Sequence, residues 1–540
     1  MNTREAKYKW QVARTLLGTG MIQLIRPDKA VRSLLALRDW GPTPAAAYTS
    51  SAIRYPDRAA VVDEKGTLTF DEVNRRTNAL ARGLGRAGVR EQDSVAIMCR
   101  NHRGFIDATV ACSKLGAGAL YLNTAFAGPQ ITDVIRREDP VAVIYDEEFA
   151  GLVSEGGADR KRFVAWHEPG KQRPSASDPL LEELIATEVD TPLTPPVEKG
   201  RVVILTSGTT GTPKGAARKQ PDSMEPAAAL FSKIPLKARE TTMIAAPMFH
   251  SWGFAHFTLG LPLASTLVLR RKFDPEDTLR AVAHHRATAL AVVPVMLQRM
   301  LELGEATIAK YDLSSLRVIA VSGSALPGEL ATRSMDAFGD VLYNLYGSTE
   351  VAWATIATPQ DLRAAPGTAG RPPMGTVVKL LDSDGREAAP GEGGRIFVAN
   401  EMVFEGYTGG GGKEIVRGLM STGDVGHFDA GGRLFVDGRD DEMIVSGGEN
   451  VFPREVEDLL ADHEQIEEAA VVGVPDDEFG QRLKAFVVTR DGATLDEDTV
   501  KAYVKTNLAR YKVPREVVFL EELPRNATGK VLKRELQTLA

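Results

Sequence analysis

The sequence predicts a large α/β protein with more than one domain, and three observations support this prediction. A chain of 540 residues, 43% of them hydrophobic, can bury a large core and should divide into domains. Short apolar runs alternate with helical stretches through the middle of the chain, as in layered α/β domains. After residue 440 the pattern becomes that of a small α+β domain. We therefore expect an amphipathic segment at 1–40, an N-terminal domain at 41–440 and a C-terminal domain at 441–540.

The expected strands are short apolar runs, and the expected helix has apolar residues at helical spacing. In the large domain these runs occupy residues 94–98, 141–145, 201–205, 289–293 and 316–321. In the small domain we expect strands at 471–474 and 483–488 and a helix at 498–509. Residues 182–199 are rich in Thr and Pro towards their end, which predicts a linker before the strand at 201–205.

The first 40 residues differ from the rest of the chain in charge. They carry eight basic and three acidic residues, a net charge of +5, whereas the whole chain has a net charge of −7. Apolar residues such as Trp10, Leu17 and Ile22 are interspersed among the charges. Two interpretations are open: a segment lying on an anionic membrane surface, or a helix docked on the protein with a solvated basic face. No apolar run reaches the length of about 18 residues that spans a bilayer.

Composition narrows the class of partner. The net charge of −7 argues against nucleic acid, because nucleic-acid binding requires a basic face. Cys99 and Cys112 lack metal-ligand spacing and are too few for a disulfide framework. We expect a cytoplasmic protein, with the N-terminal segment as its candidate contact with the inner face of the membrane.

The most specific local signal is a loop rich in glycine and hydroxyl residues directly after an apolar strand. It comprises Thr206, Ser207, Gly208, Thr209, Thr210, Gly211, Thr212, Pro213, Lys214 and Gly215. Glycines let backbone N–H groups approach phosphate oxygens, hydroxyls donate further hydrogen bonds, and a lysine neutralises charge. Pro213 before Lys214 and Gly215 after it disfavour a helix starting at the lysine, so this is not the common P-loop. The loop predicts binding of nucleotide phosphates.

Further motifs carry side chains suited to a nucleotide. The run from Tyr343 to Glu350 supplies an aromatic ring for a base, a hydroxyl for a phosphate and a carboxylate for Mg²⁺. Asp424, in the sequence Thr-Gly-Asp, can accept hydrogen bonds from ribose hydroxyls. Arg439, in the sequence Gly-Arg, supplies a guanidinium group. Three further candidate motifs are residues 322–327, residues 438–453, which include Gly447 and Gly448, and residues 524–530, which include Lys530.

Taken together, these motifs resemble those of the acyl-adenylate-forming enzymes. That family includes acyl-CoA synthetases, aryl-CoA ligases, firefly luciferase and the adenylation domains of peptide synthetases. The resemblance extends from about Tyr48 to the last helix, with the motifs in the family's order. It implies a large layered α/β adenylation domain and a small α+β domain that rotates about Asp441. Glu442 departs from the pair of aspartates that many relatives carry at 441 and 442.

The resemblance also implies a role for each motif. ATP and CoA are the expected co-substrates and Mg²⁺ the expected metal, held by Glu350. The expected nucleotide and CoA contacts are Thr206, Ser207, Gly208, Thr209, Thr210, Gly211, Lys214, Ser324, Tyr346, Gly347, Thr349, Asp424, Arg439, Gly447 and Gly448. Lys530, Thr206, Glu350 and His250 form the expected catalytic set, in which Lys530 stabilises charge during adenylation and His250 lies near the acyl pocket.

The activity implied by the resemblance is that of an AMP-forming acyl-CoA synthetase. A carboxylate attacks the α-phosphate of ATP to give acyl-AMP and pyrophosphate, and the CoA thiol then attacks the acyl carbonyl. We expect a medium- or long-chain fatty acid, because Pro247 to His250 and the N-terminal segment resemble bacterial fatty acyl-CoA synthetases. Three alternatives remain: an aryl-CoA ligase, a stand-alone acyl-AMP ligase loading a carrier protein, and a degenerate adenylate-binding protein. Lys530, Glu350 and Asp424 argue against the last.

Overall fold

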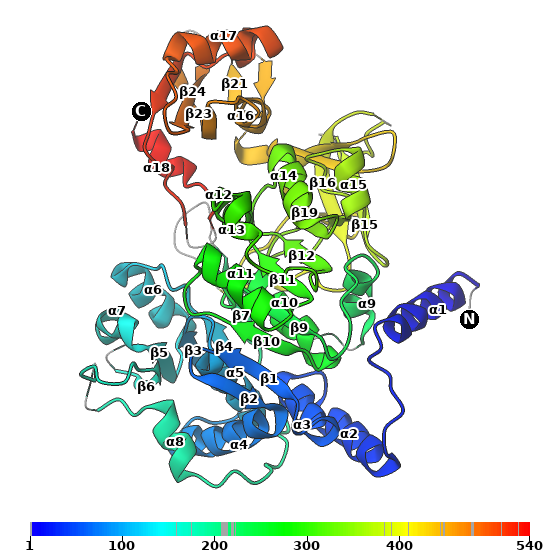
Figure 1. Cartoon of the computed structure of the whole chain (residues 1–540), viewed down its shortest axis with the longest axis vertical. Helices are drawn as coiled ribbons and strands as arrows, with labels where there is room; N and C mark the ends of the chain where they lie inside the picture. The colour runs from blue at the N-terminus through cyan, green and yellow to red at the C-terminus, as the bar shows by residue number, and fades with distance from the viewer. Residues whose placement is uncertain are drawn as a thin grey trace. The chain divides into compact units, whose positions relative to one another are not determined.

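The structure is a computed structural model that describes the chain except for residues 1–2, 158, 174, 176, 207–213, 218–220, 222, 383, 390, 409, 443, 447–448, 477–479, 509, 527–528 and 540. The chain divides into two compact units (Figure 1). The first contains residues 1–292, 302–320 and 401–412. The second contains residues 293–301, 321–400 and 413–540.

A seven-stranded sheet in the first unit runs in the order β17-β8-β7-β4-β3-β5-β6. The strands from β7 to β6 pair in parallel, whereas β8 and β17 are antiparallel at one edge. The bounds are β3 (Ser94–Met98), β4 (Gly118–Tyr121), β5 (Ala142–Asp146), β6 (Lys161–Trp166), β7 (Val202–Thr206), β8 (Lys214–Ala217) and β17 (Gly406–Tyr407). Parallel strands place all their carboxyl ends at one edge, where α/β proteins bind ligands.

Further strands of the first unit run in the order β12-β11-β9-β10-β1-β2. The pairs between β11, β9, β10 and β1 are parallel, and β2 is antiparallel to β1. The bounds are β1 (Ala59–Asp63), β2 (Gly66–Thr69), β9 (Thr241–Ile244), β10 (Thr266–Leu269), β11 (Ala289–Val292) and β12 (Val318–Val321). β9, β10 and β11 are almost continuously buried, and β10 and β11 are mostly apolar, as expected for parallel strands covered on both faces.

Helices cover the sheets of the first unit. They are α1 (Thr3–Gly18), α2 (Pro27–Trp40), α3 (Pro44–Arg54), α4 (Phe70–Arg86), α5 (Arg103–Leu115), α6 (Gly128–Glu138), η1 (Glu147–Phe149), α7 (Ala150–Gly156), α8 (Leu181–Thr187), α9 (Glu225–Phe231), α10 (Ser251–Leu263), α11 (Pro275–His284) and α13 (Glu305–Ile308). One core lies where Ile131 and Val134 of α6 and Val153 of α7 pack on Val143 of β5. Among the described residues, no helix is long and apolar enough to cross a bilayer.

The second unit begins with an antiparallel pair and an antiparallel sheet. β13 (Leu342–Tyr346) pairs with β14 (Thr355–Ala357). The sheet has the order β15-β16-β19-β18, with β20 also paired to β19. Its bounds are β15 (Val377–Leu381), β16 (Gly394–Ala399), β18 (Ile415–Val416), β19 (Leu419–Phe428) and β20 (Leu434–Arg439). The accompanying helices are α12 (Pro294–Glu302), α14 (Gly328–Phe338) and α15 (Pro359–Ala364).

The last hundred residues of the second unit form a mixed sheet with apolar residues packed on both faces. After η2 (Asp440–Glu442), the strands are β21 (Ile444–Ser446), β22 (Glu449–Val451), β23 (Ile466–Asp476), β24 (Gly480–Thr489) and β25 (Glu516–Phe519). The helices are α16 (Pro453–Ala461), α17 (Glu497–Asn507), η3 (Arg510–Lys512) and α18 (Lys533–Thr538). Leu460 and Val504 pack on one face with Leu483, whereas Leu536 packs on the other with Phe486.

The predicted α/β class is therefore correct, and each predicted strand is present within a few residues. The strand at 94–98 is reproduced, and the helix expected at 498–509 spans Glu497–Asn507. The predicted linker at 182–199 was wrong in its first part, because residues 181–187 form α8. The Glu183 carboxylate accepts the Leu180 backbone N–H at 3.0 Å, which stabilises the first turn of this short helix.

Candidate functional site

Asp424 is the centre of a polar cluster in the second unit. It faces Arg439 across the antiparallel strands β19 and β20, and Arg439 Nη1 lies 3.2 Å from Asp424 Oδ1. Tyr346, the last residue of β13, donates its hydroxyl proton to Asp424 Oδ2. Thr422 Oγ1 accepts the backbone N–H of Asp424 at 3.1 Å. The cluster joins three sequence motifs and leaves the carboxylate with fixed partners on both oxygens.

Burial sets the electrostatics of this cluster. Burial raises the pKa of Asp424, and Arg439, the Tyr346 hydrogen bond and the charge of Lys530 oppose that rise. Burial and the neighbouring Asp424 together raise the pKa of Tyr346 well above its ordinary value. The phenol therefore remains a neutral donor at physiological pH. A carboxylate held in this way is a strong acceptor for hydroxyl groups, because ionised acceptors form the stronger hydrogen bonds.

The turn after β13 is built from close backbone contacts. Ser348 Oγ accepts the backbone N–H groups of Glu350 at 3.2 Å and Val351 at 3.3 Å. A Cβ atom on Gly347 would lie 2.2 Å from the carbonyl oxygen of Ala352, so a side chain cannot fit there. The turn therefore places Thr349 and Glu350 directly after the Tyr346 ring in a fixed backbone. Both residues have further interactions within the molecule.

A second turn, that of the C-terminal loop, carries Lys530. Asn526 Oδ1 accepts the Lys530 backbone N–H at 2.9 Å, and the Asn526 backbone N–H donates to the Lys530 carbonyl at 2.9 Å. Gly529 has a φ of +78°, and a Cβ there would lie 2.3 Å from Val295 Cγ1 at the start of α12. The loop is thus tied to the second unit, and Lys530 is near enough to Asp424 to lower the pKa of that carboxyl group.

The glycine-rich loop connects two antiparallel strands of the first unit. Thr206 at the end of β7 is the register partner of Lys214 at the start of β8. Residues 207–213, which include the predicted contacts Ser207, Gly208, Thr209, Thr210 and Gly211, lie outside the described residues. Lys214 begins a strand, which confirms the expectation that no helix starts there. Its ammonium group lies 5.2 Å from the centre of the Tyr407 ring. Gly447 and Gly448 also lie outside the described residues.

His250 lies at the N-terminus of α10 in the first unit, in an apolar setting. Burial lowers its pKa to about 4, so the imidazole is neutral at physiological pH. The Phe249 ring lies 4.6 Å away, centroid to centroid, and Asn123 Nδ2 lies 3.4 Å from His250 Nε2. A neutral, buried imidazole suits a wall of a substrate pocket better than a cationic contact for a carboxylate.

Sequence reasoning missed two asparagines at the carboxyl ends of parallel strands. Asn101 follows β3, donates to the carbonyls of Ile244 and Ala246 at 3.1 and 2.9 Å, and accepts the Met248 backbone N–H at 2.8 Å. It therefore holds the segment that leads to His250. Asn123 follows β4 and contacts His250 itself. The available signal was an asparagine shortly after an apolar strand, which is too common to single out alone.

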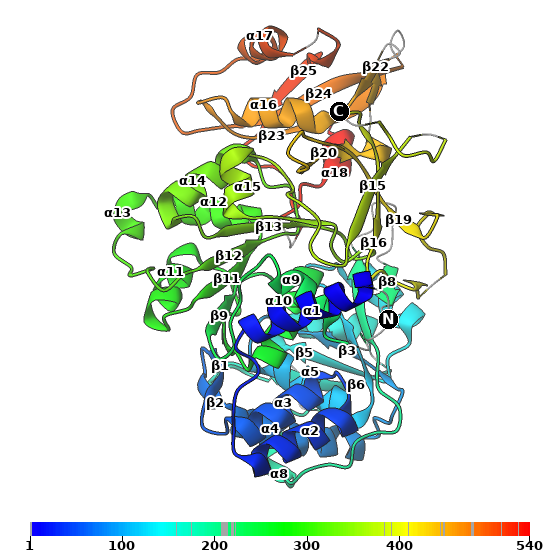
Figure 2. The same ribbon diagram turned by 90° about the vertical axis from the view of Figure 1, so that its right-hand side faces the viewer.

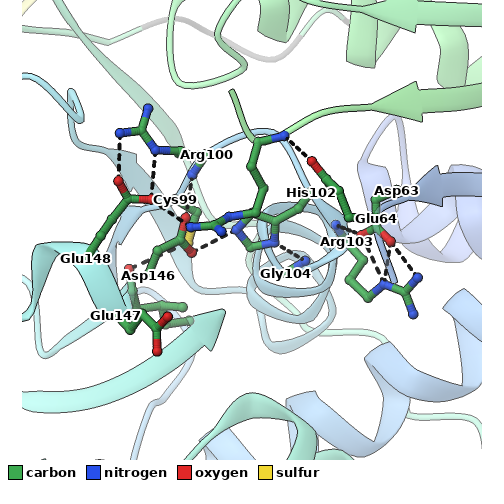
Figure 3. A network of polar contacts seen from close by, with 12 residues as sticks. Asp63, Glu64, Cys99, Arg100, His102, Arg103, Gly104, Asp146, Glu147 and Glu148 are labelled. Carbon is green, nitrogen blue, oxygen red and sulfur yellow. Dashed lines mark hydrogen bonds and ion pairs between the residues drawn. The ribbon is translucent and has the colours of Figure 1, made fainter. Parts of the chain in front are cut away.

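The structure also groups Cys99, His102 and Asp146 at the ends of β3 and β5. Their potential ligand atoms lie within 4.8 Å of one another. His102 Nδ1 accepts the Gly104 backbone N–H at 3.0 Å, so Nε2 carries the proton and donates to Asp146 Oδ1 at 2.7 Å. Asp146 Oδ2 accepts the Arg100 backbone N–H at 2.9 Å (Figure 3). Because both ring nitrogens and both carboxylate oxygens are used, the group is a buried hydrogen-bond network.

A cavity of about 980 Å³ lies near this network in the first unit. Its lining includes Trp166, Lys171, Arg270, Arg271 and Lys272 with six acidic side chains. Lys171, Arg270 and Arg271 are each paired with a lining carboxylate at 2.5 to 2.9 Å. The cavity walls are thus largely charge-compensated. Of the predicted nucleotide-binding residues that the structure describes, none lines this cavity.

Comparison with known proteins finds matches to one enzyme family in both the large and the small domain. Residues 48–408 match the pattern of an AMP-binding enzyme, and residues 455–530 that of an AMP-binding enzyme C-terminal domain. A feruloyl-CoA synthase from Amycolatopsis sp is 35% identical over 90% of this chain and 96% of the relative. An indoleacetate–CoA ligase from Aromatoleum aromaticum is 34% identical over 91% of this chain and 95% of the relative.

A solved structure has the same fold. The o-succinylbenzoate CoA synthetase from Bacillus subtilis, in complex with its acyl-adenylate intermediate, superposes with a TM-score of 0.79 at 26% identity. The match covers 91% of this chain and 97% of that one. With an adenylate-forming fold and matches over both its large and small domains, the chain belongs to the AMP-binding enzyme family.

Proposed function

We propose that this protein is an AMP-forming acid–CoA ligase that activates a carboxylic acid with ATP and transfers the acyl group to CoA. The observation that carries this proposal is the cluster of Tyr346, Asp424 and Arg439, together with Lys530, whose charge reaches Asp424. A ring, a buried carboxylate and two cations suit the base, ribose and phosphate of an adenylate. The family membership supports the same chemistry.

In this proposal several of the sequence motifs bind the nucleotide. The Tyr346 ring stacks on adenine, and Asp424 accepts the ribose hydroxyls with Arg439 holding the carboxylate in place. Ser324 and Gly347 leave room for the base, and Thr349 donates to the α-phosphate. Residues 206–211 and Lys214 bind the phosphates, a role that the glycines, hydroxyls and lysine of this motif suit.

We assign Mg²⁺ to Glu350. A Mg²⁺ ion bound with nucleotide phosphates typically takes only one or two carboxylates from the protein. A single glutamate in a fixed turn beside Tyr346 and Thr349 fits that requirement. The ion would supply charge neutralisation of the phosphates.

Lys530 is the proposed electrostatic catalyst of adenylation. The acid's carboxylate attacks the α-phosphorus, the bond to pyrophosphate breaks, and negative charge accumulates on the phosphate oxygens. An ammonium group near this charge lowers the barrier because it is already oriented in a partly desolvated site. The turn held by Asn526 supplies that orientation. No side-chain nucleophile is required, because acyl-AMP is itself an activated anhydride.

The second half-reaction requires Lys530 to leave and CoA to enter, and we propose that η2 is the hinge. Asp441 lies at its centre, with an ion pair on each side. Asp440 pairs with Arg395 of β16 at 3.1 Å, and Glu442 pairs with Lys533 of α18 at 3.4 Å. One pair connects η2 to β16 and the other connects it to α18, so rotation at Asp441, between the two, can leave both intact. Gly447 and Gly448 are then proposed to line the path of CoA.

We propose an aryl-substituted carboxylic acid as the substrate class. Relatives at 34–35% identity over about nine-tenths of the chain are a feruloyl-CoA synthase and an indoleacetate–CoA ligase. The neutral His250 beside Phe249 suits an uncharged ring or chain at the pocket wall. A fatty acid is the second candidate, and the apolar, basic N-terminal segment favours it because long-chain acids are taken from membranes. A carrier protein in place of CoA is a third.

A panel of acids tests the substrate class. Thioester formation is measured with ATP and CoA for hydroxycinnamic, indoleacetic, medium-chain and long-chain acids, alongside acid-dependent exchange of pyrophosphate into ATP. We expect kcat/KM to be highest for an aryl acid. A higher value for long-chain acids would replace the first candidate with the second. Exchange without any thioester would favour transfer to a carrier protein, and absence of both would overturn the proposed activity.

A further inference from the structure

The N-terminal segment exposes an unusual amount of apolar surface. Fourteen large hydrophobic residues of the described chain are exposed, and eight of them lie between residues 10 and 37. They are Trp10, Leu17, Ile22, Leu24, Val31, Leu34, Leu35 and Leu37. Single exposed hydrophobic residues are ordinary, but a concentration of this kind marks an interaction site.

The helix α2 exposes large aliphatic side chains that a normal surface helix would bury. Its buried face is formed by Ser33, Ala36 and Trp40, of which Ala36 and Trp40 pack with alanines of α3. Val31, Leu34 and Leu35, at spacings of three and four, lie on the opposite face and are exposed. Folding alone would place the large aliphatic side chains inside. The outward face therefore requires another partner.

The helix α1 repeats this arrangement. Its inner face carries buried Val12, the helix lies against α9, and burial together with Glu225 of α9 raises the pKa of Tyr8 to about 12. Trp10 and Leu17 lie on the outer face, 60% and 58% exposed. The Arg14 guanidinium lies 5.4 Å from the Trp10 ring centroid. Both helices lie on the side of the first unit that faces the viewer in Figure 2.

The charge of this surface indicates what kind of partner it binds. The three acids of the segment are each paired with a basic residue: Glu5 with Lys9, Asp28 with Arg26, and Asp39 with Arg38. Among the described residues, the side chains of Lys7, Arg14 and Arg32 have no acidic partner. Cations around an apolar face, with a tryptophan, suit the anionic headgroups and upper acyl region of a lipid bilayer.

We propose that the outer faces of α1 and α2 adsorb to an anionic membrane surface. The AMP-binding match begins at residue 48, so this surface lies outside the part shared with the family. Adsorption needs no nucleotide or acid, and it stands independently of the proposed ligase activity.

Sedimentation of the full-length chain with lipid vesicles tests the proposal. Vesicles of phosphatidylcholine mixed with phosphatidylglycerol are compared with vesicles of phosphatidylcholine alone, at low and high salt and without ATP. We expect binding to the anionic vesicles at low salt and much weaker binding in either other condition. Point variants are preferable to removal of residues 1–40, because truncation would expose the surfaces beneath α1 and α2.

Two pairs of variants have matched controls. Leu34→Gln with Leu35→Gln should lower the partition coefficient about ten-fold or more, since each leucine loses its burial in lipid. Arg14→Gln with Arg32→Gln should lower it about 25-fold at low salt, because each lost charge lowers it about five-fold. The controls are Val189→Gln with Val197→Gln and Arg136→Gln with Arg286→Gln, exposed residues elsewhere in the first unit. They should bind as the unmodified chain does.

Three results would overturn the proposal. The unmodified chain could remain in the supernatant with anionic vesicles at low salt. The leucine and arginine variants could bind no more weakly than their controls. Alternatively, the unmodified chain could self-associate without vesicles while the leucine variant is monomeric, which would make a second copy of the chain the occupant of this face.

Discussion

Removing the Tyr346 hydroxyl tests whether the Asp424 cluster binds the nucleotide. The substitution Tyr346→Phe keeps the ring for stacking but removes the donor to Asp424 Oδ2. A hydrogen bond to a charged group contributes about 1.5–3 kcal/mol, and 1.36 kcal/mol corresponds to one pH unit. Burial already raises the pKa of Asp424, and the Tyr346 hydrogen bond is one of the contacts that oppose this rise. The carboxyl group of the variant should therefore protonate at higher pH.

The sign of the effect follows from the proposed role. Asp424 must be ionised to accept the ribose hydroxyls, so ATP use is lost as the pH falls through the pKa of this carboxyl group. In Tyr346→Phe the acid limb of kcat/KM for ATP should move to higher pH by about one to two units. At higher pH the variant should approach the unmodified enzyme, because the stacking ring remains.

Two companion variants separate the hydroxyl from the ring. Tyr346→Leu should weaken ATP binding about 5- to 150-fold at every pH, the scale of about 1–3 kcal/mol for a lost base–aromatic stack. Tyr343→Phe, on the opposite face of β13, is the control and should leave the profile unchanged. The assay is initial-rate kinetics across pH with ATP varied. Superimposable profiles for Tyr346→Phe and the unmodified enzyme would refute the reasoning.

Three further predictions follow from the same structure. Lys530→Ala should reduce adenylation by about 100-fold or more while thioester formation from supplied acyl-AMP survives, and equal damage to both half-reactions would exclude the assigned role. Asp441→Pro, which restricts φ in η2, should leave adenylation near normal and impair the CoA step; full overall turnover would argue against the hinge. His256 is buried, neither of its ring nitrogens has a hydrogen-bond partner among the described residues, and burial lowers its pKa from 6.5 to about 4. Its neutral form stabilises the fold above pH 6.5, and up to about 3.4 kcal/mol is lost as the pH falls towards 4. His256→Phe should remove this loss in urea unfolding, unlike the exposed control His284→Phe, and an unchanged acid dependence would contradict the burial argument.

Much of the fold and of the site could be predicted because its signals are local. A run of apolar residues specifies a buried strand, and glycines after it specify a turn, so β7 and β12 were located together with the motifs that follow them. The family resemblance then predicted the adenylate-forming fold, which the comparisons confirm. The comparisons do not confirm the predicted fatty-acid preference, and pocket shape could not be predicted because it depends on side chains from several distant elements. Relatives named for aryl acids make that class at least as good a candidate.

Other features were decided only by tertiary packing. Sequence alone identified Tyr346 and Asp424 separately, but their hydrogen bond depends on how β13 and β19 are brought together. The role of Asn101 in holding the segment before His250 likewise depends on the meeting of two strand ends. In the N-terminal segment, composition predicted the charge of +5 and the amphipathic character. Which face points outward was decided by the packing of Ala36 and Trp40 of α2 on the alanines of α3, which leaves Leu35 exposed. Local sequence determines hydrogen-bonded turns and the periodicity of apolar residues. Which side chains are buried, and which of them pair, depends on contacts between residues that are distant along the chain.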